Sequence, residues 1–277
     1  MNNAFNINRF GKVLAFDGRK YIRNFGLTLA ILCGLNLVLW ILTLIFDFTM
    51  PTLPRYGVIW LGTMLGIIMV PAKAFGDINL SREGVKFAML PVSNLEKYIS
   101  YVLFCLLTPV VIVIGSWAID SLLTLLPFGG FVHYIRHFGF MNVMEDFVRE
   151  IGELADEDAE VFEQNFMGIF GSAYSYAIII GSVFNAGLFM FGNMLFKTHK
   201  TAKTLALMIG ISYVVSVIMQ IVLIARGGSF MMNTDMSDYT SINQFTNPLF
   251  IISNIVNTIL TIGLYIGLFF KLKTQKY

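Results

Sequence analysis

The sequence predicts an all-α protein, a polytopic membrane bundle of six transmembrane helices, from three observations. Hydrophobic residues make up 56% of the 277 residues and charged residues only 13%, against about 25% charged residues in a typical soluble domain. Six charge-free stretches approach or exceed the roughly 17 to 25 residues that a membrane-spanning helix needs. Basic residues fall almost entirely in alternate gaps between them. We expect one transmembrane domain, 1–277, with spans at about 27–46, 56–73, 98–120, 173–196, 204–225 and 248–270.

The distribution of Lys and Arg predicts how the chain is oriented. With the amino terminus inside, 15 of the 19 basic residues lie in cytoplasmic segments, and an excess of Lys and Arg in loops marks the cytoplasmic side. We therefore expect a multi-pass protein of the cytoplasmic (inner) membrane with both termini in the cytoplasm. The inner charge is scattered over four short segments, which favours contact with anionic lipid headgroups over binding of nucleic acid.

The segment before the first span is basic and periodic. Its apolar residues recur at a spacing of three to four through much of the segment, which predicts an amphipathic helix lying in the inner headgroup layer. A disordered basic tail is the alternative. The apolar residues are Ile7, Phe10, Val13, Leu14 and Tyr21, and the basic ones are Arg9, Lys12, Arg19, Lys20 and Arg23.

The loop between spans two and three is the most charged cytoplasmic loop and has the clearest local signals. Pro91 disfavours helical backbone at Leu90. Ser93, followed three residues later by Glu96, matches a capping box, so a new helix should begin directly after Ser93 and run into span three. Upstream, Ser81 is expected to cap a short helix that ends near Leu90.

Spans two and three each carry one feature of interest. Gly62 and Gly66 lie four residues apart in span two, a spacing that lets helices approach closely. Asp120 lies near the outer end of span three, and an ionisable residue inside a membrane indicates a functional site by default. Counting the roughly 20 residues of a span from Tyr98 puts Asp120 at the outer interface, where we expect water to solvate it.

The outer segment 127–172 contains nine acidic residues between positions 145 and 163. We expect a solvated amphipathic helix over the outer mouth of the bundle. His133 and His137 share a helical face in this segment, but two histidines make a weak metal signal, because a zinc site needs three or four ligands. Interfacial polar histidines are the favoured interpretation.

Catalytic motifs are absent from the sequence. It contains no phosphate-binding glycine loop of the Walker type, no paired-histidine zinc helix and no glycine-flanked serine elbow. We expect no catalytic residue, no metal, no cofactor and no enzyme activity, so any ATP hydrolysis must occur in another subunit. The polar residues within the spans are uncharged, which suits an amphipathic or lipid-like substrate better than an inorganic ion.

These features together resemble the type-2 ATP-binding cassette (ABC) transporter permeases, including small permease-like proteins of Bacteroidota. The likeness consists of a basic interfacial helix, six spans and an inner loop with Leu90-Pro91-Val92-Ser93 followed by Glu96-Lys97. In that family the permease has no ATPase, and a separate nucleotide-binding subunit docks on a coupling helix between spans two and three. Two permease subunits, identical or different, form the pathway. The ATPase-facing surface implied here comprises Arg82, Glu83, Lys86, Phe87, Leu90, Pro91, Ser93 and Glu96.

The resemblance implies a membrane permease subunit that exports an amphipathic or lipid-like substrate and is powered by a separate ATPase. One departure concerns residues 226–247, which are too polar to match the hydrophobic hairpin that many exporters of the family carry between spans five and six. The alternative function is a non-transporting membrane scaffold or sensor subunit that binds a partner through the acidic outer segment.

Overall fold

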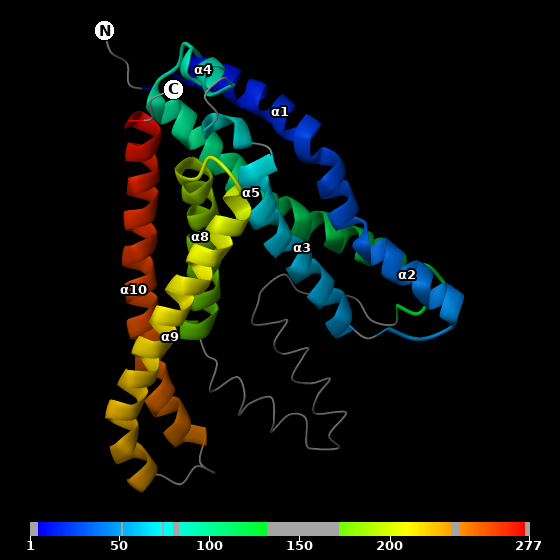
Figure 1. Cartoon of the computed structure of the whole chain (residues 1–277). Coiled ribbons are helices and arrows are strands. Elements are labelled where there is room, and N and C mark those ends of the chain that lie inside the picture. Colours follow the sequence, from blue (N-terminus) through cyan, green and yellow to red (C-terminus); the bar gives the residue numbers. More distant parts are fainter. Residues whose placement is uncertain are drawn as a thin grey trace. The chain divides into compact units, whose positions relative to one another are not determined.

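The computed structural model describes residues 5–50, 52–73, 75–79, 83–131, 172–233 and 239–274. All regular secondary structure in these ranges is helical, so the expected all-α class is confirmed. The helices are α1 (Ile7–Cys33), α2 (Leu35–Phe46), α3 (Thr52–Lys73), the 3-10 helix η1 (Gly76–Asn79), α4 (Glu83–Ala88), α5 (Asn94–Thr124), α8 (Ser172–Leu195), α9 (Lys200–Asn233) and α10 (Tyr239–Thr274) (Figure 1).

Five helices in the described ranges are long and apolar enough to cross a membrane. They are Phe25–Phe46, Pro54–Lys73, Asn94–Thr124, Lys200–Ile218 and Ile251–Thr274. The apolar part described in α8, Ile179–Leu195, is shorter. The multi-pass membrane character expected from the sequence is therefore supported by five candidate spans, and the fourth expected span falls on α8.

The chain divides into two compact units. The first unit comprises Met1–Phe138, Ala186–Lys203 and Leu264–Tyr277, and the second comprises Gly139–Asn185 and Thr204–Gly263. In the second unit, the hydroxyls of Tyr176 and Thr258 lie 3.4 Å apart and join α8 to α10. The candidate site around the loop between α3 and α5 belongs to the first unit.

Helix α5 is the central helix of the first unit, and α1 and α2 run parallel to it. The Tyr21 hydroxyl lies 3.0 Å from the Thr108 hydroxyl, and further along the Asn36 amide donates to the Ser116 carbonyl oxygen at 3.2 Å. Residue numbers thus rise together along both helices, as expected for two spans that cross the membrane in the same direction. Interhelical hydrogen bonds of this kind fix the register of the two helices.

Helix α3 runs antiparallel to α5 and approaches it closely at Gly66. A Cβ atom at Gly66 would lie 2.6 Å from Ile112 Cδ1 and 3.1 Å from Thr108 Cγ2, whereas one at Gly62 would meet Ile112 at an ordinary 3.6 Å. The close approach that this glycine spacing permits is present at Gly66.

The basic segment before the first span is helical and forms the first part of α1. Asn6 caps α1 by accepting from the backbone N–H groups of Asn8 and Arg9. The helix continues without a break to Cys33, and it therefore joins the first span directly. Val13 and Tyr21, two of the apolar residues of this segment, are buried in the structure. The position of α1 in the headgroup layer stays a prediction.

The segment after α5 folds back against the end of α2. The Met50 N–H donates to the Gly130 carbonyl oxygen at 2.8 Å, and the Gly130 N–H donates to the Thr43 hydroxyl at 2.9 Å. A side chain at Gly130 would overlap the carbonyl oxygen of Phe48. This contact brings Phe131 onto the ends of α3 and α5.

Candidate functional site

The predicted capping box at the start of α5 is present. Ser93 has extended backbone, and its hydroxyl accepts from the Glu96 N–H at 3.2 Å. In return, the Ser93 N–H donates to Glu96 Oε2 at 2.9 Å. The helix begins at Asn94, directly after the cap. The local sequence signals therefore position this end of the loop as predicted.

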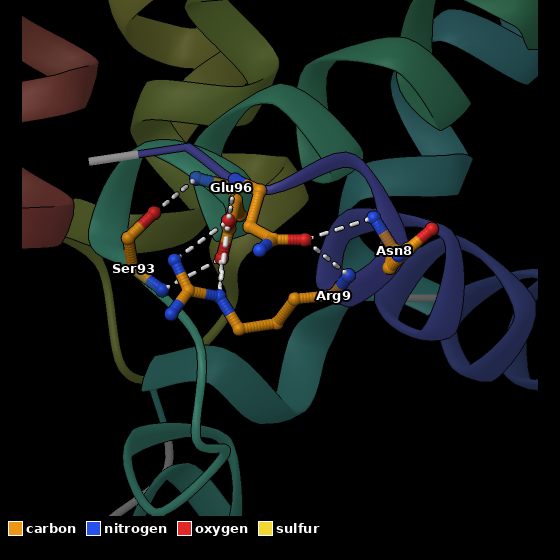
Figure 2. A network of polar contacts seen from close by, with 5 residues as sticks. Asn8, Arg9, Ser93 and Glu96 are labelled. Carbon is orange, nitrogen blue, oxygen red and sulfur yellow. Dashed lines mark hydrogen bonds and ion pairs between the residues drawn. The ribbon is translucent and has the colours of Figure 1, made fainter. Parts of the chain in front are cut away.

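The carboxylate of Glu96 also holds the start of α1 (Figure 2). The Arg9 guanidinium binds both carboxylate oxygens, because Nε lies 2.8 Å from Oε2 and Nη2 lies 2.8 Å from Oε1. The Asn6 N–H donates to Oε1 at 2.8 Å. Bidentate, charge-assisted contacts of this kind fix geometry as well as contribute energy. One buried carboxylate thus caps α5 and anchors α1 at the same time.

The sequence analysis missed Arg9 and Asn6 as partners of Glu96. Arg9 stood among the basic residues of the amino-terminal segment without an assigned partner, and it lies 87 positions away from Glu96 in the sequence. The signal available for Asn6 was its place as an N-cap residue directly before a periodic run. No comparable local signal indicates the pairing across the fold.

The upstream end of the inner loop is anchored as well. The Phe75 ring is buried, and its carbonyl oxygen accepts from the Asn193 amide at 3.2 Å. The Lys200 ammonium donates to the carbonyl oxygen of Gly76. The loop between α3 and α5 is therefore tied to the bundle at both of its ends.

The residues predicted to face an ATPase occupy different environments. Phe87 and Leu90 are half-buried, and the Lys97 ammonium lies 5.2 Å from the Phe87 ring centroid. Pro91 is exposed, and so is Met89 beside it, with 78% of its surface accessible. The exposed apolar surface of the turn is therefore made by Met89 and Pro91, of which the predicted set includes only Pro91.

The other predicted site residues divide into three groups. Glu83 and Lys86 belong to α4, whereas Arg82 and the predicted cap Ser81 lie outside the described residues. Ser93 is half-buried in the cap. Glu96 is fully buried, so it contributes to this surface by holding α1 and α5 in place.

A second polar pair in the amino-terminal half joins α1 to α5. The Ser100 hydroxyl donates to Asp17 Oδ2 at 2.5 Å, and both residues are buried. Burial raises the pKa of the Asp17 carboxyl, while the Ser100 hydrogen bond and the charge of Lys20 oppose that rise. The hydrogen bond supplies part of the solvation that the carboxyl loses on burial.

The start of α3 and the last turns of α5 are joined by an ion pair that the sequence analysis did not predict. Arg55 Nε lies 3.0 Å from Asp120 Oδ1, Nη2 donates to Oδ2 at 3.0 Å, and both side chains are 0% exposed. The Phe131 ring centroid lies 4.4 Å from Arg55 Cζ. The expectation that water solvates Asp120 is wrong. The Arg55 guanidinium balances its charge instead.

Metal binding finds no support in the part of the chain that the structure describes. No group of three or more His, Cys, Asp or Glu side chains there could hold a metal ion. His133 and His137, together with the rest of the acidic outer segment from 132 to 171, lie outside the described residues.

Comparisons of the chain with models of protein families, with curated proteins and with solved structures give no match. The resemblance to type-2 ABC permeases is therefore carried by the membrane topology and the inner loop alone. The function proposed below rests on the geometry of the membrane helices and of the loop between α3 and α5.

Proposed function

We propose that this chain is the membrane permease subunit of an ABC transporter, driven by a separate ATPase that docks on the α4–α5 turn. The observation that carries the proposal is the anchored inner loop. Its end at Ser93 and Glu96 is tied to α1, and its start at Phe75 is tied to α8. Between these ends, Met89 and Pro91 are exposed. An apolar element held at both ends can pass a displacement to the spans, as a docking element must.

The placement of helix ends in the first unit supports six spans. The start of α1 contacts the start of α5 through Arg9 and Glu96. The last part of α10 reaches the same end of α5, since the rings of Tyr98 and Phe269 are 5.4 Å apart and the Tyr98 hydroxyl donates to the Tyr265 carbonyl oxygen. Ends that share one side of a membrane require an even number of crossings, which the five candidate spans alone do not supply.

Helix α8 is the natural sixth span. Its 24 residues extend about 36 Å at roughly 1.5 Å per residue, which exceeds the roughly 30 Å thickness of the hydrocarbon core. The side that holds both helix ends is also the basic side of the sequence, and excess Lys and Arg marks the cytoplasm. This orientation places the α4–α5 turn where an ATPase could reach it.

The proposed substrate is an amphipathic or lipid-like molecule that is exported. Ser212, Ser216 and Gln220 lie four residues apart on α9 and are exposed, so they give one uncharged polar face to the otherwise apolar stretch 205–225. A substrate with both polar and apolar parts matches such a face better than an ion does. As the family resemblance implies, two permease subunits would enclose the pathway.

Affinity purification of the full-length protein from native membranes tests the proposal. A separate Walker-motif ATPase should be recovered with the wild type, and Met89→Asp should lower its recovery while membrane insertion stays normal. Phe128→Asp is the matched control, because it places the same charge on an exposed apolar residue at the other end of α5. Recovery of a partner bound to the acidic outer segment, without any ATPase, would contradict this proposal and favour a non-transporting scaffold.

A further inference from the structure

Helix α1 has two opposite faces. Val13, Asp17, Tyr21 and Phe25 recur every fourth residue and are buried, and Asp17 and Tyr21 contact α5. The exposed residues on the opposite side recur at a spacing of three to four, which places them on a single helical face. They form what we call the outward face, comprising Lys12, Phe16, Arg19, Ile22 and Arg23.

The rotation of α1 about its own axis is fixed. Three contacts, those of Arg9 with Glu96, Asp17 with Ser100 and Tyr21 with Thr108, hold the helix against α5 over 13 residues. Turning the outward face toward the bundle would break all three. The outward face therefore points away from α5 as long as these contacts persist.

The charged residues on the outward face are all basic. The face carries Lys12, Arg19 and Arg23, which span about 17 Å along the helix at roughly 1.5 Å per residue. The acidic residue in α1 is Asp17, which lies on the opposite face and is bonded to Ser100. A surface with three aligned positive charges and no carboxylate attracts anions.

The outward face is also apolar between its charges. Phe16 is 53% exposed and Ile22 is 69% exposed, which is a large apolar area for a surface that meets only water. Beyond Ile22 the same side continues into exposed Leu27, which belongs to the candidate span Phe25–Phe46. Along the helix, the surface thus changes from mixed basic and apolar to apolar, as the bilayer changes from headgroups to acyl chains.

We propose that the outward face is a binding surface for anionic phospholipids, with the basic side chains on the headgroup phosphates and with Phe16 and Ile22 among the upper acyl carbons. The proposal rests on the orientation given under the proposed function but not on transport or on an ATPase. The lipid surface is favoured over an acidic protein because the face continues directly into a membrane span.

Lipid retention by the purified full-length protein tests this surface. The protein is equilibrated in mixed micelles that contain seven parts phosphatidylcholine and three parts phosphatidylglycerol, and the bound lipids are counted by native mass spectrometry. The wild type should be enriched in phosphatidylglycerol. Each basic residue near an anionic surface contributes about a fivefold preference, so the triple variant Lys12→Gln, Arg19→Gln, Arg23→Gln should lose at least fivefold of the enrichment.

A matched triple variant removes the same total charge elsewhere. Lys197→Gln, Lys203→Gln, Lys273→Gln changes three exposed basic residues outside α1, and it should keep the enrichment within about twofold. Equal loss in both triple variants would mean a general charge effect and would overturn the proposal. Unchanged enrichment in the α1 variant overturns it as well, and if recovery of the ATPase falls at the same time, the face binds protein. An ATPase absent from every preparation contradicts the proposed function but leaves this result untouched.

Discussion

Replacing Asp120 with Ala should lower the free energy of unfolding by about 3–5 kcal/mol, which is the usual cost of removing one partner of a buried ion pair. The full value applies because Arg55 and Asp120 are both 0% exposed, so water cannot screen the charge that is left. The guanidinium of Arg55 stays protonated at any accessible pH, and it therefore cannot escape the cost by becoming neutral.

The reverse replacement should behave differently. Arg55→Met leaves the carboxyl of Asp120, which can take up a proton and become neutral instead of remaining a buried charge. We therefore expect a smaller loss for Arg55→Met than for Asp120→Ala. The double variant Arg55→Met, Asp120→Leu removes both charges and should lie within about 1 kcal/mol of the wild type or above it.

Unfolding of the purified protein by sodium dodecyl sulfate in mixed micelles measures the free energy of unfolding of the wild type and of the three variants. Asp47→Asn is the matched control. Asp47 is an exposed acidic residue directly after α2 with left-handed backbone (φ 49°), which Asn tolerates as Asp does, so removal of its charge should cost no more than about 0.5 kcal/mol. The reasoning is refuted if Asp120→Ala is as mild as this control, or if the double variant loses as much as the two single losses together.

Three further predictions concern the cap, the helix packing and the topology. Ser93→Ala should cost about 0.5–2 kcal/mol at the start of α5, visible as faster hydrogen exchange in its first turn and unchanged exchange in its middle. Gly66→Ala should overpack the α3–α5 contact, lower the free energy of unfolding by about 1–3 kcal/mol and so lower the melting temperature. Gly57→Ala, where an added Cβ meets no atom within 4 Å, should leave the melting temperature unchanged. Equal effects of the two variants would contradict the packing argument. In a cysteine-free background, an impermeant thiol reagent added to intact cells should label Asp47→Cys but not Lys273→Cys; labelling of the latter excludes a cytoplasmic carboxyl terminus.

Short-range sequence patterns predicted local structure correctly. The start of α5 follows from Ser93, Glu96 and the preceding Pro91, because a capping box is made by residues three positions apart. The helical state of the amino-terminal segment follows from its periodicity. In both cases the interacting groups are close in the chain, so the pattern contains all the information needed.

Sequence patterns could not assign the partners of charged residues. Arg9 pairs with Glu96 across 87 positions and Arg55 pairs with Asp120 across 65. Which charges meet depends on the rotation and register of packed helices, and these are set by close contacts such as that at Gly66. A count of residues along span three placed Asp120 near its outer end, but it could not show that protein, not water, surrounds it.

The sequence by itself determined the helical, membrane-like character of this protein and the start of α5. These properties depend on composition and on neighbours within one helical turn. Only the tertiary structure decided that Glu96 joins two helices, that Asp120 is neutralised by Arg55 and that α1 keeps a basic face directed away from α5. Each of these depends on how separate helices are rotated against one another, and that rotation is fixed by packing across the whole bundle.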